Sequence, residues 1–145
     1  MRDYQQGKVY GWERNFKEGP WSNFNEIQTI VNYIWNDLSL KYPPQVDKLH
    51  NKDKALGRAN RLKVYFPEKG ASLLTILHEL AHSLTAKVDD YTHQHNEYFV
   101  GMYMTLLNKY LGYEYPVLWY LANKYGVQFQ LNVRPLIEDG QSIYG

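Results

Sequence analysis

The residues best placed to do chemistry lie in one short stretch, His78-Glu79-Leu80-Ala81-His82. Residues four apart lie on one face of an α-helix, so His78 and His82 can direct their imidazole nitrogens at a single ion. Glu79 is placed to act as a general base toward a metal-bound water. With five His in 145 residues, the expected number of chance matches is about 0.007. The pattern therefore predicts a zinc hydrolase.

The helix that carries this motif is predicted over residues 72–87 and is amphipathic. At roughly 100° per residue, its leucines gather on one side, while Glu79 and His82 lie with the other polar residues on the opposite side. The alternative interpretation is a solvated helix face, which would carry Lys and Arg. The next Asp, Glu, Lys or Arg after Glu79 is Lys87. We therefore expect the polar face to line a cleft.

A catalytic zinc usually takes three protein ligands and leaves one position for water, so a third ligand is needed. The stretch after the helix offers Asp90, His93, His95 and Glu97. We choose His95, because it directly precedes an apolar stretch whose N-cap is predicted to be Asn96. A rigid helix start would fix its position. His93 is the nearest competitor, followed by Asp90 and Glu97.

This order of residues resembles the metal motif of the SprT-like (Spartan-like) zinc metallopeptidases. In that family His-Glu-x-x-His is followed by His-Gly-x-x-Phe. Here the matching residues are His78-Glu79-x-x-His82 and then His95-Asn96-x-x-Phe99. One departure is Asn where Gly is usual, and Asn tolerates left-handed backbone better than most residues.

The start of the chain adds to the resemblance. Small metallohydrolases of actinobacteria and their phages open in a similar way to Arg2-Asp3-x-Gln5-x-x-Lys8-Val9-Tyr10. The resemblance therefore covers most of the length, although only the metal motif is specific. A second departure is the absence of cysteine, which excludes the C-terminal zinc ribbon that some SprT-like proteins use to engage DNA.

The resemblance implies an α+β, zincin-like fold, in which a small sheet packs on the metal helix with additional helices. It implies Zn²⁺ as the cofactor, with His78, His82 and His95 as ligands and Glu79 as the catalytic base. A metallopeptidase built in this way cleaves a peptide (amide) bond in a peptide or protein substrate with a zinc-bound water that Glu79 activates.

Two alternatives stay open. One is a catalytically silent zinc-binding structural or interaction module, whose fourth metal position would be closed by His93, Asp90 or Glu97. The other is a hydrolase of a non-peptide amide. A hydrolase would also need a group that stabilises the oxyanion, for which Tyr91, Tyr98 and Tyr103 are candidates.

Composition sets the outer bounds. A chain of 145 residues that is 44% hydrophobic and 21% charged is expected to form a single domain over residues 1–145. A net charge of +1 provides no field that would recruit nucleic acid or a membrane. Without cysteine and without a secretory apolar segment in residues 1–10, the protein is expected to be cytoplasmic.

The spacing of apolar residues and the positions of Pro, Gly and helix-capping residues predict the helices and strands around the motif. Asn23-x-x-Glu26 forms a capping box for a helix that Pro43-Pro44 ends. Strands are predicted over residues 61–66 and, more weakly, 45–50, and residues 8–12 are ambiguous. Further helices are predicted from 96 to 111 and from 116 to 125, and Gly126 is expected to end the second of these helices.

The strand before the metal helix has a candidate role of its own. Leu62, Val64 and Phe66 alternate with Arg61 and Lys63, which predicts a strand with one buried face. We expect an edge strand that binds extended substrate by main-chain pairing, with Leu62, Val64 and Phe66 as substrate-binding residues. The alternative is an ordinary edge strand that its charged residues protect.

Two further features carry weaker expectations. Gly101 lies inside an apolar helix, where Gly costs about 1 kcal/mol relative to Ala, and we expect it to pack closely against the metal helix. Residues 41–69 carry more basic than acidic side chains. A solvated face is the favoured interpretation of this segment, and contact with nucleic acid is the alternative.

Overall fold

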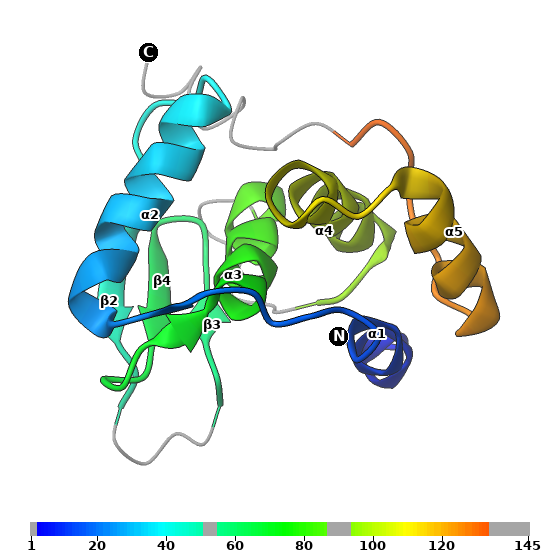
Figure 1. Ribbon diagram of the computed structural model, residues 1–145, viewed down its shortest axis with the longest axis horizontal. Helices are drawn as coiled ribbons and strands as arrows, with labels where there is room; N and C mark the ends of the chain where they lie inside the picture. Colours follow the sequence, from blue (N-terminus) through cyan, green and yellow to red (C-terminus); the bar gives the residue numbers. More distant parts are fainter. Residues whose placement is uncertain (1–2, 51–54, 87–93, 134–145) are drawn as a thin grey trace.

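The computed structural model describes residues 3–50, 55–86 and 94–133. Over these residues helices and short strands form an α+β arrangement, as predicted (Figure 1). In chain order the elements are α1 (Gln6–Glu13), β1 (Trp21–Ser22), α2 (Phe24–Asp37), β2 (Gln45–Lys48), β3 (Arg58–Ala59), β4 (Lys63–Phe66), β5 (Ala71–Ser72), α3 (Leu73–Thr85), α4 (Glu97–Leu111) and α5 (Tyr115–Lys124).

The metal-motif helix, α3, lies between the three-stranded sheet and α4 (Figure 1). It begins where the hydroxyl of Ser72 accepts a hydrogen bond from the Thr75 amide at 3.2 Å. Most of its side chains are buried, including both histidines and Glu79 of the motif. The predicted amphipathic helix is confirmed, and its polar residues face the interior of the protein.

The sheet order corrects the prediction of an edge strand over residues 62–66. β4 is the central strand, because β2 pairs with it in parallel on one side and β3 pairs antiparallel on the other. The side chains of Val64 and Phe66 are fully buried in the core, whereas Leu62 precedes the strand and is 48% exposed. Main-chain pairing with β2 and β3 therefore occupies the edges that a substrate strand would need.

Arg61 also differs from its expected position on a solvated side of the strand. Its side chain is buried, and its guanidinium carbon lies 5.7 Å from the ring centroid of Trp35. Two other basic residues of this segment form surface ion pairs, Lys48 with Glu68 and Lys63 with Asp47. The segment is therefore less uniformly cationic than its composition indicates.

The capping box of α2 is present, since the Glu26 carboxylate accepts a hydrogen bond from the Asn23 amide at 2.9 Å. The helix ends at Asp37, earlier than the proline pair that was expected to end it. Ser39 follows with a left-handed φ of 61°, which a continuing helix does not allow. The weaker prediction of a strand near residue 45 is confirmed by β2.

Asn96 caps α4, because its side chain accepts a hydrogen bond from the Phe99 amide at 2.9 Å. Gly112, with a φ of 75°, follows the last helical residue. Pro116 lies in the first turn of α5, and the ambiguous residues 8–12 belong to α1. None of the described helices is long and apolar enough to cross a membrane.

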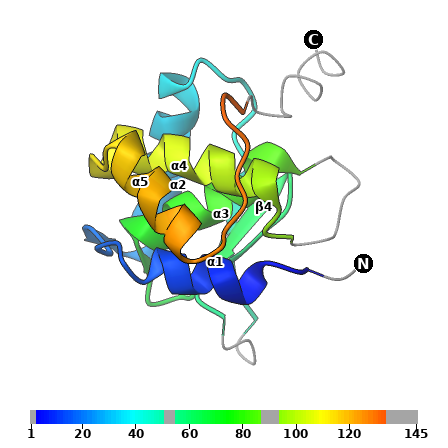
Figure 2. The same ribbon diagram turned by 90° about the vertical axis from the view of Figure 1, so that its right-hand side faces the viewer.

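The neighbour of Gly101 is not the metal helix. A Cβ atom at this position would lie 2.2 Å from the carbonyl oxygen of Gln130 and 2.5 Å from Cγ2 of Val133. The stretch that follows α5 thus runs directly against α4 (Figure 2). Glycine is required here because the backbone of residue 130 occupies the space of a side chain.

Candidate metal centre

Three histidines come together in the interior. His78 and His82 extend from successive turns of α3, and His95 precedes the cap of α4. The Nε2 atom of His95 lies 3.2 Å from Nε2 of His82 and 3.3 Å from Nε2 of His78. All three side chains are buried, and within the described part of the chain they form a group able to hold a metal ion.

The outer nitrogens of two of these rings are bound to carboxylates. Nδ1 of His78 lies 2.6 Å from Oε2 of Glu13, and Nδ1 of His95 lies 2.7 Å from Oδ2 of Asp3. A carboxylate accepts a hydrogen bond from Nδ1–H, which leaves a lone pair on each Nε2. Two such lone pairs at 3.3 Å repel each other unless a cation or a proton lies between them. The three histidines could therefore bind a metal ion here.

Glu13 has a third partner, Tyr103, whose hydroxyl donates to the same carboxylate oxygen. Burial alone would raise the pKa of the Glu13 carboxyl. The hydrogen bonds from His78 and Tyr103 nevertheless hold this pKa below its usual value. Burial and the Glu13 charge raise the pKa of Tyr103 well above its usual range. Tyr103 therefore stays protonated and donates to Glu13, so its hydroxyl is not directed at a substrate.

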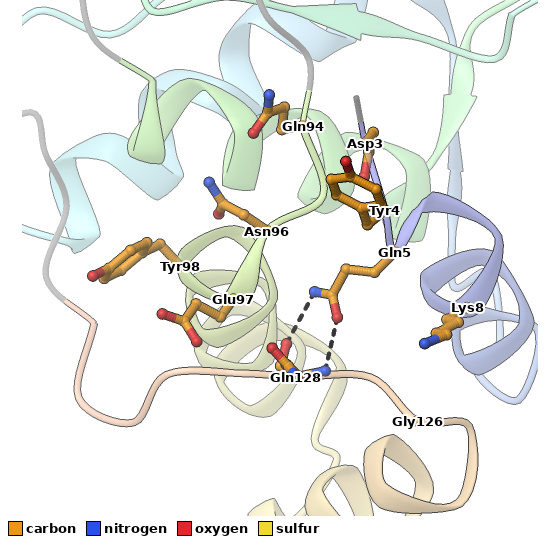
Figure 3. A pocket seen from close by; sticks show the side chains of 10 residues that line it. All are labelled: Asp3, Tyr4, Gln5, Lys8, Gln94, Asn96, Glu97, Tyr98, Gly126 and Gln128. Carbon is orange, nitrogen blue, oxygen red and sulfur yellow. Dashed lines mark hydrogen bonds between the residues drawn. The ribbon is translucent and has the colours of Figure 1, made fainter. Parts of the chain in front are cut away.

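Asp3 and Gln5 hold the backbone around His95. The Asp3 carboxylate also accepts a hydrogen bond from the His95 amide at 3.1 Å. The side-chain amide of Gln5 donates to the carbonyl oxygens of His95 and Gln128 and accepts from the Gln128 amide; its two bonds to Gln128 are drawn in Figure 3. The segment before α1 thus fixes the third histidine.

Phe99 packs against the back of the cluster. Its fully buried ring stacks on His82, with centroids 4.2 Å apart and planes 25° apart. It also contacts His78 and His95 edge-on, at centroid distances of 5.1 Å and 5.0 Å. This packing restricts the orientation of all three imidazoles.

Glu79 is buried beside the cluster but does not belong to the group that could hold the ion. Burial, with a smaller contribution from the Glu13 charge, raises the pKa of Glu79 to about 7, against opposing contributions from His78 and Arg58. A Cβ atom on Gly57 would lie 2.9 Å from Oε2 of Glu79. Glycine at position 57 therefore lets the backbone before β3 pass directly over this carboxylate.

His78 and Glu79 open onto a cleft of about 600 Å³, lined by α1, α3 and residues 55–57. A second pocket, of about 490 Å³, lies beside Asp3 and Asn96, and neither His78 nor Glu79 lines it (Figure 3). The polar face of the helix was predicted from the sequence to line a cleft, and this cleft gives access to the histidine cluster.

Two of the other residues considered for the site lie at the second pocket. Glu97 and Tyr98 line the second pocket, and Tyr98 is 51% exposed. Asp90, His93 and Tyr91, which were weighed as ligands or as an oxyanion stabiliser, lie outside the described residues.

Sequence reasoning missed the contribution of the N-terminal segment. Asp3, Tyr10 and Glu13 all lie at the site, yet they are far in sequence from the metal motif. The one available signal was the resemblance of the opening stretch to the small metallohydrolases, which includes Asp3 and Tyr10.

Scans against protein-family models, characterised proteins and solved structures find no match to this chain. The motif and the geometry of the site are therefore the features that bear on function.

Proposed function

We propose that this protein is a zinc-dependent metallopeptidase with a zincin-like fold, of the kind that the SprT-like motif implies. The observation that carries the proposal is the convergence of three Nε2 atoms beside the buried carboxylate of Glu79, at a cleft open to substrate. The arrangement of α3 against a small sheet and α4 supports the same conclusion.

The donor set fits zinc. Four tetrahedral ligands at the usual Zn–N length of 2.0–2.1 Å lie about 3.3–3.4 Å from one another. The Nε2 atom of His95 lies 3.2 Å from that of His82 and 3.3 Å from that of His78. His78, His82 and His95 would hold the ion, and Glu13 and Asp3 orient two of the rings. Zinc bound by three neutral imidazoles supplies a Lewis acid and lowers the pKa of its water toward about 7.

Glu79 is the proposed general base. Its pKa of about 7 suits a group that must accept and release a proton near neutral pH. It accepts a proton from the attacking water and returns it to the amine that leaves. Its place outside the metal-holding group leaves the carboxylate available for this work.

The substrate is proposed to be an extended peptide that lies in the cleft. Because β4 is the central strand, the main-chain pairing first expected of residues 62–66 is reassigned to β3. Among the described residues β3 pairs with β4 on one side only, and it directly follows Gly57, which contacts Glu79. A strand added at this edge would pass the proposed base.

Metal content tests the site first. Inductively coupled plasma mass spectrometry should find about one zinc per chain in the wild type, as expected for one three-ligand site. His78→Ala, His82→Ala and His95→Ala should each lose the metal. Folded wild type that takes up no zinc, even when zinc is added back, would refute the proposal.

Peptide hydrolysis by a Glu79 variant tests the assignment of Glu79 as the general base. Glu79→Gln should keep the zinc and lose cleavage of a peptide panel, whereas the matched control Glu68→Gln, at an exposed surface ion pair, should keep both. Activity in Glu79→Gln would remove the base assignment. Cleavage of non-peptide amides alone would indicate the alternative hydrolase, and a zinc with four protein ligands by X-ray absorption would indicate a silent module.

A further inference from the structure

Tyr10 lies at the opening of the metal centre. It is on α1, one helical turn before Glu13, so both residues share a helix face. Its ring packs edge-on against His95 at a centroid distance of 5.0 Å and lies nearly parallel to His78 at 6.1 Å. Tyr10 is 36% exposed and lines the same cleft as His78 and Glu79. Its ring therefore covers two of the three histidines from the substrate side.

The hydroxyl of Tyr10 is suited to donate. The side-chain amide of Gln6 donates to the Tyr10 oxygen at 3.3 Å. A phenol can accept and donate at the same time, so the Tyr10 hydrogen can be directed into the cleft. Tyr103 and Tyr98 differ, because the first donates to Glu13 and the second lies at the other pocket.

We propose that Tyr10 is a catalytic residue that stabilises the oxyanion formed when a peptide carbonyl is attacked in the cleft. The proposal rests on the proposed function and adds to it the one group that the mechanism lacks. A preorganised donor aimed at developing negative charge is commonly the largest single contribution to such catalysis.

The step balances without any further reactant. The water oxygen forms a bond to the carbonyl carbon, the π electrons move to the carbonyl oxygen, and Glu79 takes the water proton. Tyr10 donates a hydrogen bond to that oxygen and keeps its own proton. When the C–N bond breaks, the carbonyl re-forms and the amine leaves with the proton from Glu79.

Tyr10→Phe separates this role from packing, because it keeps the ring against His78 and His95 and removes only the hydroxyl. We expect unchanged zinc content and KM and a kcat lower by about 100- to 1,000-fold, the usual effect of removing one oxyanion donor. The matched control is Tyr120→Phe, at an exposed position on α5, which should keep wild-type kcat.

A binding measurement gives a readout that does not depend on turnover. A phosphinic peptide carries a tetrahedral, negatively charged centre, whereas the amine product of cleavage carries no anionic oxygen at this position. Calorimetry should show that Tyr10→Phe weakens phosphinic-peptide binding by about tenfold or more, since a donor to a charged group is lost. Binding of the product should not change.

The outcomes distinguish the two proposals. Equal kcat and equal phosphinic-peptide affinity in wild type and Tyr10→Phe would overturn the role of Tyr10 and leave the peptidase intact. Equal losses of phosphinic-peptide and product binding would show that Tyr10 only shapes the cleft, which also overturns the role. A zinc-loaded wild type that cleaves no peptide and binds no phosphinic peptide would overturn both proposals.

Discussion

Two carboxylate–histidine pairs flank the candidate metal centre, Glu13 with His78 and Asp3 with His95. The two bonds have nearly the same length, 2.6 Å and 2.7 Å, and the side chains of Glu13 and Asp3 are 21% and 19% exposed. The pairs differ in their further contacts. Glu13 also accepts from Tyr103 on α4, whereas the second hydrogen bond of Asp3 comes from the backbone of His95 itself.

The difference separates two ways of fixing a ligand. Glu13 joins α1, α3 and α4 through one carboxylate, so the position of His78 depends on the packing of three helices. Asp3 is attached to one short segment, which Gln5 holds independently through the carbonyl of His95. Equal bond lengths therefore do not imply that the two carboxylates contribute equally to zinc affinity. Substitution of each carboxylate can measure its contribution.

Among substitutions outside the three histidines, the largest effect on zinc affinity is expected for Glu13→Gln. Loss of the charge weakens the bond to His78 and removes the favourable acceptor for Tyr103. Substitutions that disrupt such outer partners typically lower metal affinity by about 10- to 100-fold, and we expect a value near the upper end. Competition titration with a chelator measures it.

A smaller loss of zinc affinity, of about tenfold, is expected for Asp3→Asn. The bond from Gln5 to the His95 carbonyl remains in this variant and keeps the backbone in place. The same chelator titration applies. A loss equal to or larger than that of Glu13→Gln would contradict the comparison, because it would mean that the single-segment pair matters as much as the three-helix pair.

Tyr103→Phe tests whether the hydrogen bond from Tyr103 to Glu13 accounts for the larger loss of zinc affinity expected for Glu13→Gln. It removes the hydrogen bond to Glu13 but keeps the buried ring, so zinc affinity should fall less than in either carboxylate variant. The free energy of unfolding should fall by about 1.5–3 kcal/mol, as for a hydrogen bond to a charged group. Chemical denaturation measures the second quantity.

The matched control for Tyr103 lies on the same helix. Tyr110 also donates to a carboxylate, at 2.7 Å from Oδ2 of Asp37, but this pair lies at the surface. Tyr110→Phe should leave zinc affinity unchanged. A similar loss of affinity in both variants would show that α4 acts through its general stability and not through Glu13.

Gly101→Ala, like Tyr110→Phe, is expected to leave zinc affinity unchanged. The added Cβ would meet the backbone of Gln130 at 2.2 Å, and overpacking of this kind costs about 1–3 kcal/mol. The unfolding transition should move to lower denaturant concentration, while chelator titration gives the wild-type affinity. Lower zinc affinity in this variant would mean that loss of stability alone weakens the site.

Much of the metal helix could be predicted from the sequence. The spacing of His78 and His82 determines that both lie on one helix face, because an α-helix repeats every 3.6 residues. The caps at Asn23 and Asn96 could be identified for the same local reason, since a cap bonds to amides within three residues. The choice of His95 also followed from a local feature, the helix start at Asn96.

The tertiary structure alone decided which strand is central, what covers Gly101 and which groups complete the candidate metal site. β4 has the pattern of a strand with one buried face, but its pairing with β2 and β3 depends on chain segments that no periodicity connects. Asp3, Tyr10 and Glu13 reach the histidines only because α1, and the residues before it, lie against α5 and meet side chains of α3 and α4. Local sequence patterns determine which face of an element is buried, whereas contacts between distant segments depend on how the whole chain packs.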